Sequence, residues 1–367
     1  LPKHEQLIRN ILKQYGLNKH SHVLGYTVYG KNAMIANYPP LHVPSLRKSW
    51  FETAVELDKL QTNPNCAQAY ATSRYNSIGL QFNLSYKPKP TPAIVLNKVR
   101  KPRVAIIREE GTNGHRELGA AFHLAGFESW DVSLTDIANN QISLSIFDGL
   151  AIAGGFGFSD VLDAGKGMAA VIRQNKHIWR EFQKFLERPD TFVLGVCNGC
   201  QVLSLLGLVP WPGIEVERQP RFIRNACGRF IHEFVTLQIQ ESPSLFLKDM
   251  MGSNLGIWVA HGEGRLHCPD KQILNSILNN NLAPLRYVNN DKAPNIITEE
   301  YPFNPNGSPL GIAALTSRDG RCLALMPHPE RLLQPWQWPY WPQAWNKIKT
   351  SPWLKLFQNA REWCEQN

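Results

Sequence analysis

The sequence predicts an α/β protein with a doubly wound, mostly parallel sheet, preceded by a small α+β segment. Three observations support this fold class. The chain has 367 residues, enough for two or three domains. After residue 103, short apolar runs alternate with amphipathic stretches, which is typical of a parallel sheet covered by helices on both faces. The residues before 96 contain helix-like and strand-like stretches but lack a core of their own.

The first 95 residues are expected to form two helices and a hairpin. Apolar residues between 7 and 15 recur at helical spacing and stop at a glycine. Residues 23–29 and 33–36 are β-rich and separated by a short turn, which predicts a hairpin. The apolar stripe of residues 46–60 predicts an amphipathic helix entered after Pro44. That stripe needs a partner to cover it.

A segment rich in proline and lysine, residues 87–101, is typical of a linker. The sequence therefore predicts three parts: an opening segment at 1–95, a linker at 96–102 and the main domain at 103–367.

Alternating elements follow the linker. Strands are expected at residues 104–107, 129–132, 150–153 and 192–196, and helices at 117–124, 168–172 and 201–206. The last third adds strands at 234–239, 257–260, 312–316 and 322–326 and a final helix at 352–364.

Cys197 lies where the apolar run 192–196 meets a helical pattern. Gly195 and Gly199 flank it, so the backbone can turn sharply and present the sulfur at the carboxyl end of the strand. Open α/β sheets place their active sites at that edge. The start of a helix also favours negative charge, so this position suits a nucleophile.

A second buried run, residues 322–326, leads into His328 and Glu330. The histidine is a candidate base and the glutamate can orient it, so with Cys197 they complete a nucleophilic triad. The glycine-rich turn 154–157, after the strand at 150–153, lets backbone N–H groups approach a developing oxyanion. The N–H of Asn198 is the natural second donor.

Other interpretations of these residues remain open. Cys197 and Cys200 form a C-x-x-C pair, which could serve redox chemistry or half of a zinc site, but no second pair supports a metal and none is expected. A related cysteine hydrolase or peptidase could use the same turn. The formal net charge of +9 is not joined to a nucleic-acid motif, so no nucleic-acid partner is expected.

The composition favours a cytoplasmic protein. Seven cysteines without regular spacing fit a reducing compartment. No secretory signal or membrane span is visible, so no membrane partner is expected. The chain starts at Leu1, not methionine, which suggests a portion of a longer protein.

Three segments, residues 195–201, 260–264 and 326–330, resemble class I glutamine amidotransferases. Four others, residues 107–115, 304–309, 352–353 and 357–361, resemble the carboxyl-terminal glutaminase of a narrower family within them, the large single-chain phosphoribosylformylglycinamidine synthases. Residues 45–50 and 63–67 resemble the tail of the synthetase portion of the same family.

The resemblance implies that Cys197 is the nucleophile, His328 the base and then the acid, and Glu330 the residue that fixes its tautomer. Gln201 and His261 would line the glutamine pocket. Gly155 and Phe156 belong to the family's oxyanion turn, which this chain retains.

The implied function is to hydrolyse glutamine and pass ammonia to a synthetase domain, in the same longer chain or in trans. There, ATP and Mg²⁺ would support amidination of formylglycinamide ribonucleotide in purine biosynthesis; no cofactor is expected in this chain itself. The chain departs from the family at Gly157, Phe158 and Ser159, where the usual residues are Ser, Tyr and Gly. A synthase-like binding or regulatory protein with altered or lost activity is therefore the alternative.

Overall fold

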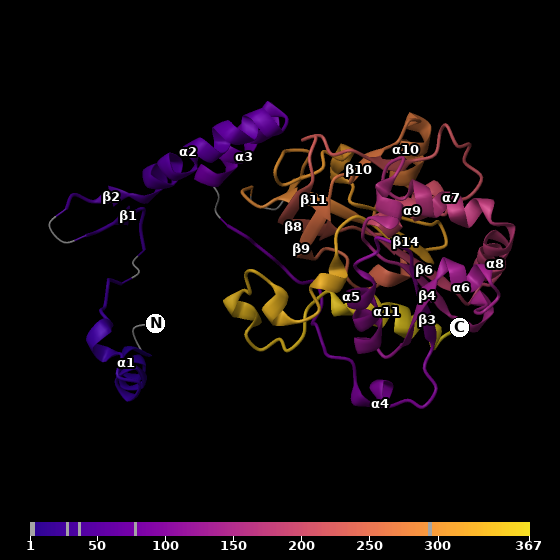
Figure 1. Cartoon of the computed structure of the whole chain (residues 1–367), viewed down its shortest axis with the longest axis horizontal. Helices are drawn as coiled ribbons and strands as arrows, with labels where there is room; N and C mark the ends of the chain where they lie inside the picture. Colours follow the sequence, from indigo (N-terminus) through magenta and orange to yellow (C-terminus); the bar gives the residue numbers. More distant parts are fainter. Residues whose placement is uncertain (1–3, 27–28, 36–37, 77–78, 293–295) are drawn as a thin grey trace. The chain divides into compact units, whose positions relative to one another are not determined.

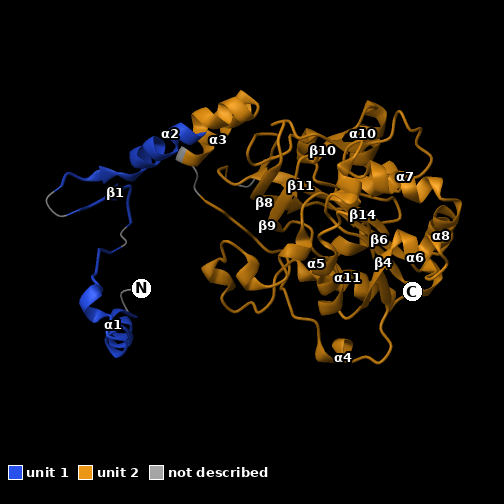
Figure 2. Ribbon diagram, viewed as in Figure 1, with its two compact units in different colours: residues 1–54 blue, residues 55–367 orange. Residues whose placement is uncertain are grey.

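The computed structural model describes residues 4–26, 29–35, 38–76, 79–292 and 296–367. The chain divides into two compact units, Leu1–Ala54 and Val55–Asn367 (Figure 1; Figure 2).

The first unit contains α1 (Glu5–Gln14), a short ribbon in which β1 (Asn32–Ala33) pairs antiparallel with β2 (Leu41–His42), and most of α2 (Val43–Gln61). Both predicted helices are present, and α2 begins earlier than expected because a proline is tolerated in a first helical turn. The predicted hairpin is wrong: described residues 23–26 form no strand, and β1 pairs with a later segment. Residues 27, 28 and 36 of that prediction lie outside the described residues.

A six-stranded sheet carries the second unit, in the order β13-β14-β6-β5-β3-β4, with only β13 antiparallel. Its apolar strands are buried on both faces, as expected of a parallel sheet. This confirms the predicted fold class. The strands are β3 (Arg103–Arg108), β4 (Glu128–Ser133), β5 (Gly149–Ile152), β6 (Phe192–Val196), β13 (Ala314–Thr316) and β14 (Cys322–Leu325).

Two groups of helices pack on this sheet. One comprises α7 (Lys166–Gln174), α8 (Lys176–Glu187) and α9 (Asn198–Leu205); the other comprises α5 (His115–Leu124) and α11 (Leu354–Cys364) (Figure 1). α8 was not predicted, although Asn175 caps it and its buried Ile178, Phe182 and Phe185 recur at helical spacing. The remaining α-helices in the described part of the chain are α3 (Pro64–Asn76), α4 (Ala93–Leu96), α6 (Leu134–Ala138) and α10 (Lys271–Asn279).

A separate antiparallel sheet, in the order β12-β11-β8-β9, is formed by residues that lie between β6 and β13 in the sequence. β8 (Ile231–Ile239) and β9 (Asn254–His261) contain the predicted strands, whereas β11 (Leu285–Asn289) and β12 (Ile296–Ile297) were not predicted. β7 (Arg221–Ile223) and β10 (Arg265–His267) form a further pair. β9 matters for the site because its last residue is His261.

The segment before β3 is attached to the second unit by specific bonds. Asn83 pairs with Asn254 of β9, and the Tyr86 hydroxyl donates to the carbonyl of Pro352 at 2.7 Å. The Thr91 hydroxyl donates to the carbonyl of Leu124 at 2.6 Å. The two compact units meet at residue 54. This boundary does not test the linker expected at residues 96–102, which stays a prediction.

Candidate active site

Cys197 occupies the sharp turn between β6 and α9. Its φ is 54°, in the left-handed region that residues with a Cβ seldom adopt, and its N–H donates to the carbonyl of Leu325 in β14 at 2.9 Å. A Cβ on Gly199 would lie 2.0 Å from the carbonyl oxygen of Ile152 in β5. Only a glycine therefore lets α9 start this close to the sheet.

His328 and Glu330 follow β14, the strand paired with β6. The parallel register aligns Leu325 with Val196, so the residues after the two strands emerge side by side. The Nδ1 of His328 lies 2.6 Å from Oε1 of Glu330, and both side chains are 1% exposed. The His328 backbone N–H donates to the carbonyl of Trp258 in β9 at 2.9 Å, which fixes the ring between two sheets.

The other ring nitrogen of His328, Nε2, is buried and makes no hydrogen bond within the described part of the chain, and the Cys197 thiol lies 3.6 Å from the carbonyl oxygen of Ala260. A Cβ placed on Gly154 would lie 3.0 Å from Cε1 of His328 and 3.2 Å from Cβ of Cys197, so the two side chains border the same point. Burial alone would favour a neutral imidazole, but Glu330 and then Cys197 overcome it and raise the pKa of His328 to about 9. His328 and Glu330 therefore form a hydrogen-bonded pair, and the ring of His328 lies next to the side chain of Cys197.

Two of the three predicted oxyanion residues have a backbone N–H that is not used in the described fold. Gly155 follows β5, and Asn198 follows Cys197 directly; within the described residues, neither N–H donates to another protein group. The N–H of Phe156 is not free, because it donates to the carbonyl of Gly111 at 2.8 Å. Its ring packs against Phe230 with centroids 6.1 Å apart. The N–H groups of Gly155 and Asn198 are therefore available as donors, whereas that of Phe156 is not.

Of the two predicted pocket residues, Gln201 lies in α9, which starts directly after Cys197, and His261 is the last residue of β9. Gln201 donates through Nε2 to the carbonyl of Glu263 at 2.7 Å. Glu263 also borders a cavity of about 410 Å³. His261 is 3% exposed, and burial followed by the charge of His328 lowers its pKa to about 3. It is a neutral side chain in this site.

A buried asparagine network holds the segment 261–264 in place. Asn306 donates through Nδ2 to the carbonyl of Gly264 at 2.7 Å and lies 3.3 Å from Nε2 of His261. Asn225 donates to the carbonyl of His261 at 2.8 Å and accepts from the N–H of Gly264 at 2.9 Å. Asn225 was missed because an isolated asparagine carries no sequence pattern.

The departure at 157–159 lies in a strained turn beside this site. Phe158, Ser159 and Asp160 all have φ between 52° and 57°, in the left-handed region that residues with a Cβ seldom adopt. Asp160 accepts a hydrogen bond from Nδ2 of Asn198 at 3.2 Å. Burial and the charge of Glu263 raise the pKa of Asp160 to about 6.

Cys200, the second thiol of the C-x-x-C pair, is fully buried in α9, and burial raises its pKa well above the ordinary value. All seven cysteines are described, and each is a free thiol. Among the described residues no cluster of three or more His, Cys, Asp or Glu could hold a metal ion. None of the described helices is long and apolar enough to cross a bilayer.

Comparison with known proteins gives consistent relatives. The chain is 49% identical over 325 residues to a probable phosphoribosylformylglycinamidine synthase, chloroplastic/mitochondrial, of Arabidopsis thaliana, covering 87% of this chain and 23% of that protein. It is 42% identical over 335 residues to the phosphoribosylformylglycinamidine synthase of Homo sapiens, covering 88% of this chain and 25% of that protein. This chain therefore spans about a quarter of the length of these relatives.

A solved structure, PurLQS from Thermotoga maritima, matches with a TM-score of 0.53 and 26% identity, over 72% of this chain and 99% of that chain. The family model for a CobB/CobQ-like glutamine amidotransferase domain matches residues 101–364. That match covers the parallel sheet, the elbow and both residues after β14, so the chain belongs to this glutamine amidotransferase family.

Proposed function

We propose that this chain hydrolyses glutamine with Cys197 as nucleophile and supplies the ammonia to a synthetase. The observation that carries the proposal is the 2.6 Å contact between Nδ1 of His328 and Oε1 of Glu330, on a ring whose Cε1 borders the same point as Cβ of Cys197. A cysteine, an oriented imidazole and two backbone donors are the parts that amide hydrolysis through a thioester needs.

The first half of the reaction forms the thioester. The thiol proton of Cys197 passes to Nε2 of His328, and the sulfur attacks the side-chain carboxamide carbon of glutamine. The N–H groups of Gly155 and Asn198 stabilise the oxyanion. When the carbon–nitrogen bond breaks, His328 gives its proton to the departing nitrogen, which leaves as ammonia.

The second half restores the thiol. Water attacks the thioester carbonyl while His328 accepts its proton; glutamate leaves as the carbon–sulfur bond breaks, and the proton returns to sulfur. Glu330 holds Nδ1 protonated throughout and stabilises the imidazolium. Gln201 and the neutral His261 line the substrate pocket.

The use of the ammonia is inferred from the relatives, which are named phosphoribosylformylglycinamidine synthases. We infer that a synthetase portion outside this chain accepts it and, with ATP and Mg²⁺, converts formylglycinamide ribonucleotide to formylglycinamidine ribonucleotide. The cytoplasm is the compartment inferred from cysteine usage, although the plant relative is named chloroplastic/mitochondrial.

A glutamine analogue bearing an alkylating group tests the first part of this proposal. We expect it to modify Cys197 and to spare Cys200, because the latter is buried behind the elbow. Peptide mass spectrometry after treatment identifies the modified thiol, and glutamine should protect it. Equal labelling of both thiols, or labelling that glutamine does not slow, contradicts the proposal.

The strained turn at 157–159 motivates a test of the alternative, a synthase-like binding or regulatory protein with altered or lost activity. In the complete synthase, glutamine-dependent and ammonia-dependent product formation are compared. A competent glutaminase supports both. Activity with ammonia alone would mean that this chain has lost its chemistry and retains a structural role.

A further inference from the structure

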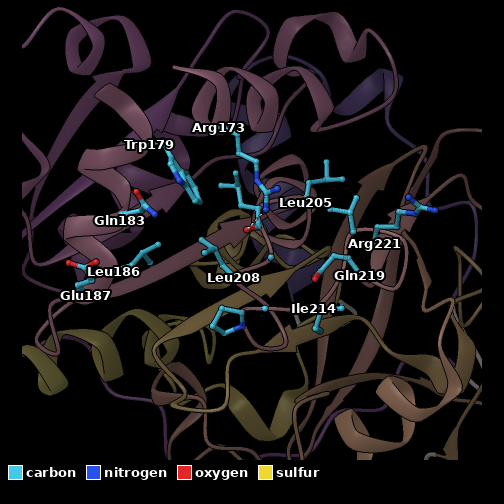
Figure 3. Close-up of a pocket in the computed structure, with 15 residues that line it drawn as sticks. Arg173, Trp179, Gln183, Leu186, Glu187, Leu205, Leu208, Ile214, Gln219 and Arg221 are labelled. Carbon is cyan, nitrogen blue, oxygen red and sulfur yellow. Dashed lines mark hydrogen bonds between the residues drawn. The ribbon is translucent and has the colours of Figure 1, made fainter. Parts of the chain in front are cut away.

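A second cavity, distinct from the one beside Glu263, lies at the far end of the nucleophile helix. It measures about 430 Å³ and is bounded by α7, α8, the end of α9 and the segment that leads into β7 (Figure 3). Its walls are largely apolar, with Leu205, Leu208 and Ile214 on one side and the indole of Trp179 on another. Such a cavity can hold a flat molecule of nucleotide size.

One polar atom in its wall has no partner. Gln219 is 7% exposed, and its Oε1 makes no hydrogen bond within the described part of the chain. The amide orientation is defined, because its Nε2 donates to the carbonyl of Val209 at 2.8 Å; a flipped amide would set two oxygens against each other. A buried acceptor without a partner is costly, and because Oε1 is itself shielded from solvent, the Gln219 side chain must turn slightly toward the cavity for a ligand donor to reach it.

Two arginines in the same wall lack carboxylate partners. Arg173 donates through Nη2 to the carbonyl of Leu206 at 2.9 Å, and its guanidinium carbon lies 5.7 Å from the ring centroid of Trp179. Neither Arg173 nor Arg221 makes an ion pair among the described residues. Glu187, the acidic lining residue, lies at the opposite side of the cavity from Arg221 (Figure 3).

Gly207 brings the unpaired acceptor and a donor together. A Cβ on this residue would lie 3.7 Å from Nη2 of Arg173 and 3.8 Å from Oε1 of Gln219, so both groups border one point. A base edge with an N–H beside a ring or carbonyl acceptor complements that pair. The charge of Arg221 complements a phosphate.

We propose that this cavity is a binding site for a purine nucleoside monophosphate. The base lies against Trp179 and Leu208, its N–H donates to Gln219, and its phosphate contacts Arg221. The site shares Leu205 and Arg221 with the cavity beside Glu263, so a bound nucleotide would contact the end of the helix that starts at Cys197.

Calorimetric titration of the full chain tests the proposal with a matched pair of ligands. Inosine monophosphate carries an N–H and a carbonyl at the base edge; purine riboside monophosphate has the same phosphate and ring system without either. We expect inosine monophosphate to bind about tenfold more tightly, the order of effect of one lost hydrogen bond to a buried group. Inorganic phosphate alone should bind more weakly than both.

Two variants locate the site. Ile214→Trp fills the cavity and should abolish nucleotide binding, and Arg221→Gln should weaken binding at least tenfold. Arg180→Gln, an exposed change on α8 outside the cavity, is the control and should bind as the unmodified chain does. Near-ultraviolet circular dichroism verifies that each variant is folded.

Equal affinity for the two nucleotides, undiminished binding by folded Ile214→Trp, or no binding at millimolar concentration would overturn the proposal. Because these titrations contain no glutamine, their failure leaves the proposed hydrolysis untouched, and a failed labelling of Cys197 leaves this site untouched.

Discussion

The two compact units differ in what stabilises them. Among described residues 4–54 none is buried, and α1 and α2 leave large apolar side chains such as Ile11 and Trp50 exposed. In the second unit, whole strands such as β5 and β6 are buried. The second unit therefore carries its own hydrophobic core, whereas the first has helices whose apolar faces are uncovered. Catalysis needs side chains held in fixed positions, so we expect it in the second unit, which has its own hydrophobic core.

The largest effect should come from the sulfur of that unit. Cys197→Ala is expected to reduce glutamine hydrolysis to background, a loss on the order of 10⁶-fold by analogy with removal of other catalytic nucleophiles. Glutamate release measures it. Cys200→Ala is the matched control and should retain most activity, because that thiol only fills space in α9. Undiminished turnover by the Cys197 variant would refute the assignment.

The orienting carboxylate comes next. Glu330→Gln keeps the shape but removes the charge that raises the pKa of His328, so hydrolysis should fall by roughly 10⁴-fold. In the unmodified chain the rate should decline as pH rises through about 9, where His328 loses its acidic proton. In the variant, this alkaline limb should move to lower pH, because burial then dominates.

The same shift links the site to folding. The pKa of His328 in the folded chain lies above its ordinary value of 6.5. The ion pair of His328 with Glu330 therefore contributes fully to the free energy of unfolding below pH 6.5, and this contribution is lost as the pH rises through about 9. A pH–rate profile that is the same for the unmodified chain and for Glu330→Gln would contradict the electrostatic coupling between Glu330 and His328.

A change of backbone contact should have a smaller effect. Gly199→Ala places a Cβ 2.0 Å from the carbonyl oxygen of Ile152, so α9 must move away from β5. The free energy of unfolding should fall by about 3 kcal/mol, the upper range for overpacking a core. Urea denaturation measures it. Gly119→Ala in α5 is the control: its Cβ would have no neighbour closer than 3.9 Å, so it should not destabilise.

The smallest effect should follow removal of residues 1–42, which leaves α2 whole. Since no described residue in that stretch is buried, the melting temperature of the remaining chain should change by less than about 2 °C, as expected for a loss of exposed surface alone. Differential scanning calorimetry decides the point. A fall of many degrees would mean that the second unit is not self-supporting.

Much of the second unit could be predicted because its strands are uninterrupted apolar runs and because its candidate catalytic residues come soon after the ends of these strands. The elbow at Cys197 and the histidine after residue 326 were placed correctly by that rule. α8 and α10 were overlooked although each has an N-terminal cap, Asn175 and Asp270, and apolar residues at helical spacing.

Other features had no local pattern to reveal them. The short strand β11 is a strand because it pairs with β8 and β12. β8 lies far from it in the sequence, so no local pattern in residues 285–289 reveals the pairing. The hairpin in the first unit was misplaced because β-rich composition does not fix pairing when no face is buried. The amide network around Asn225 depends on three-dimensional proximity alone.

That network has a consequence for recombining this chain with its relatives. Asn225, the segment 261–264 and Asn306 exchange hydrogen bonds as one unit although more than 30 residues separate each from the next. A chimera whose crossover falls between them would join two parental backbones that were never matched, leaving amides unpaired next to His261. Functional hybrids should therefore inherit all three segments from a single parent.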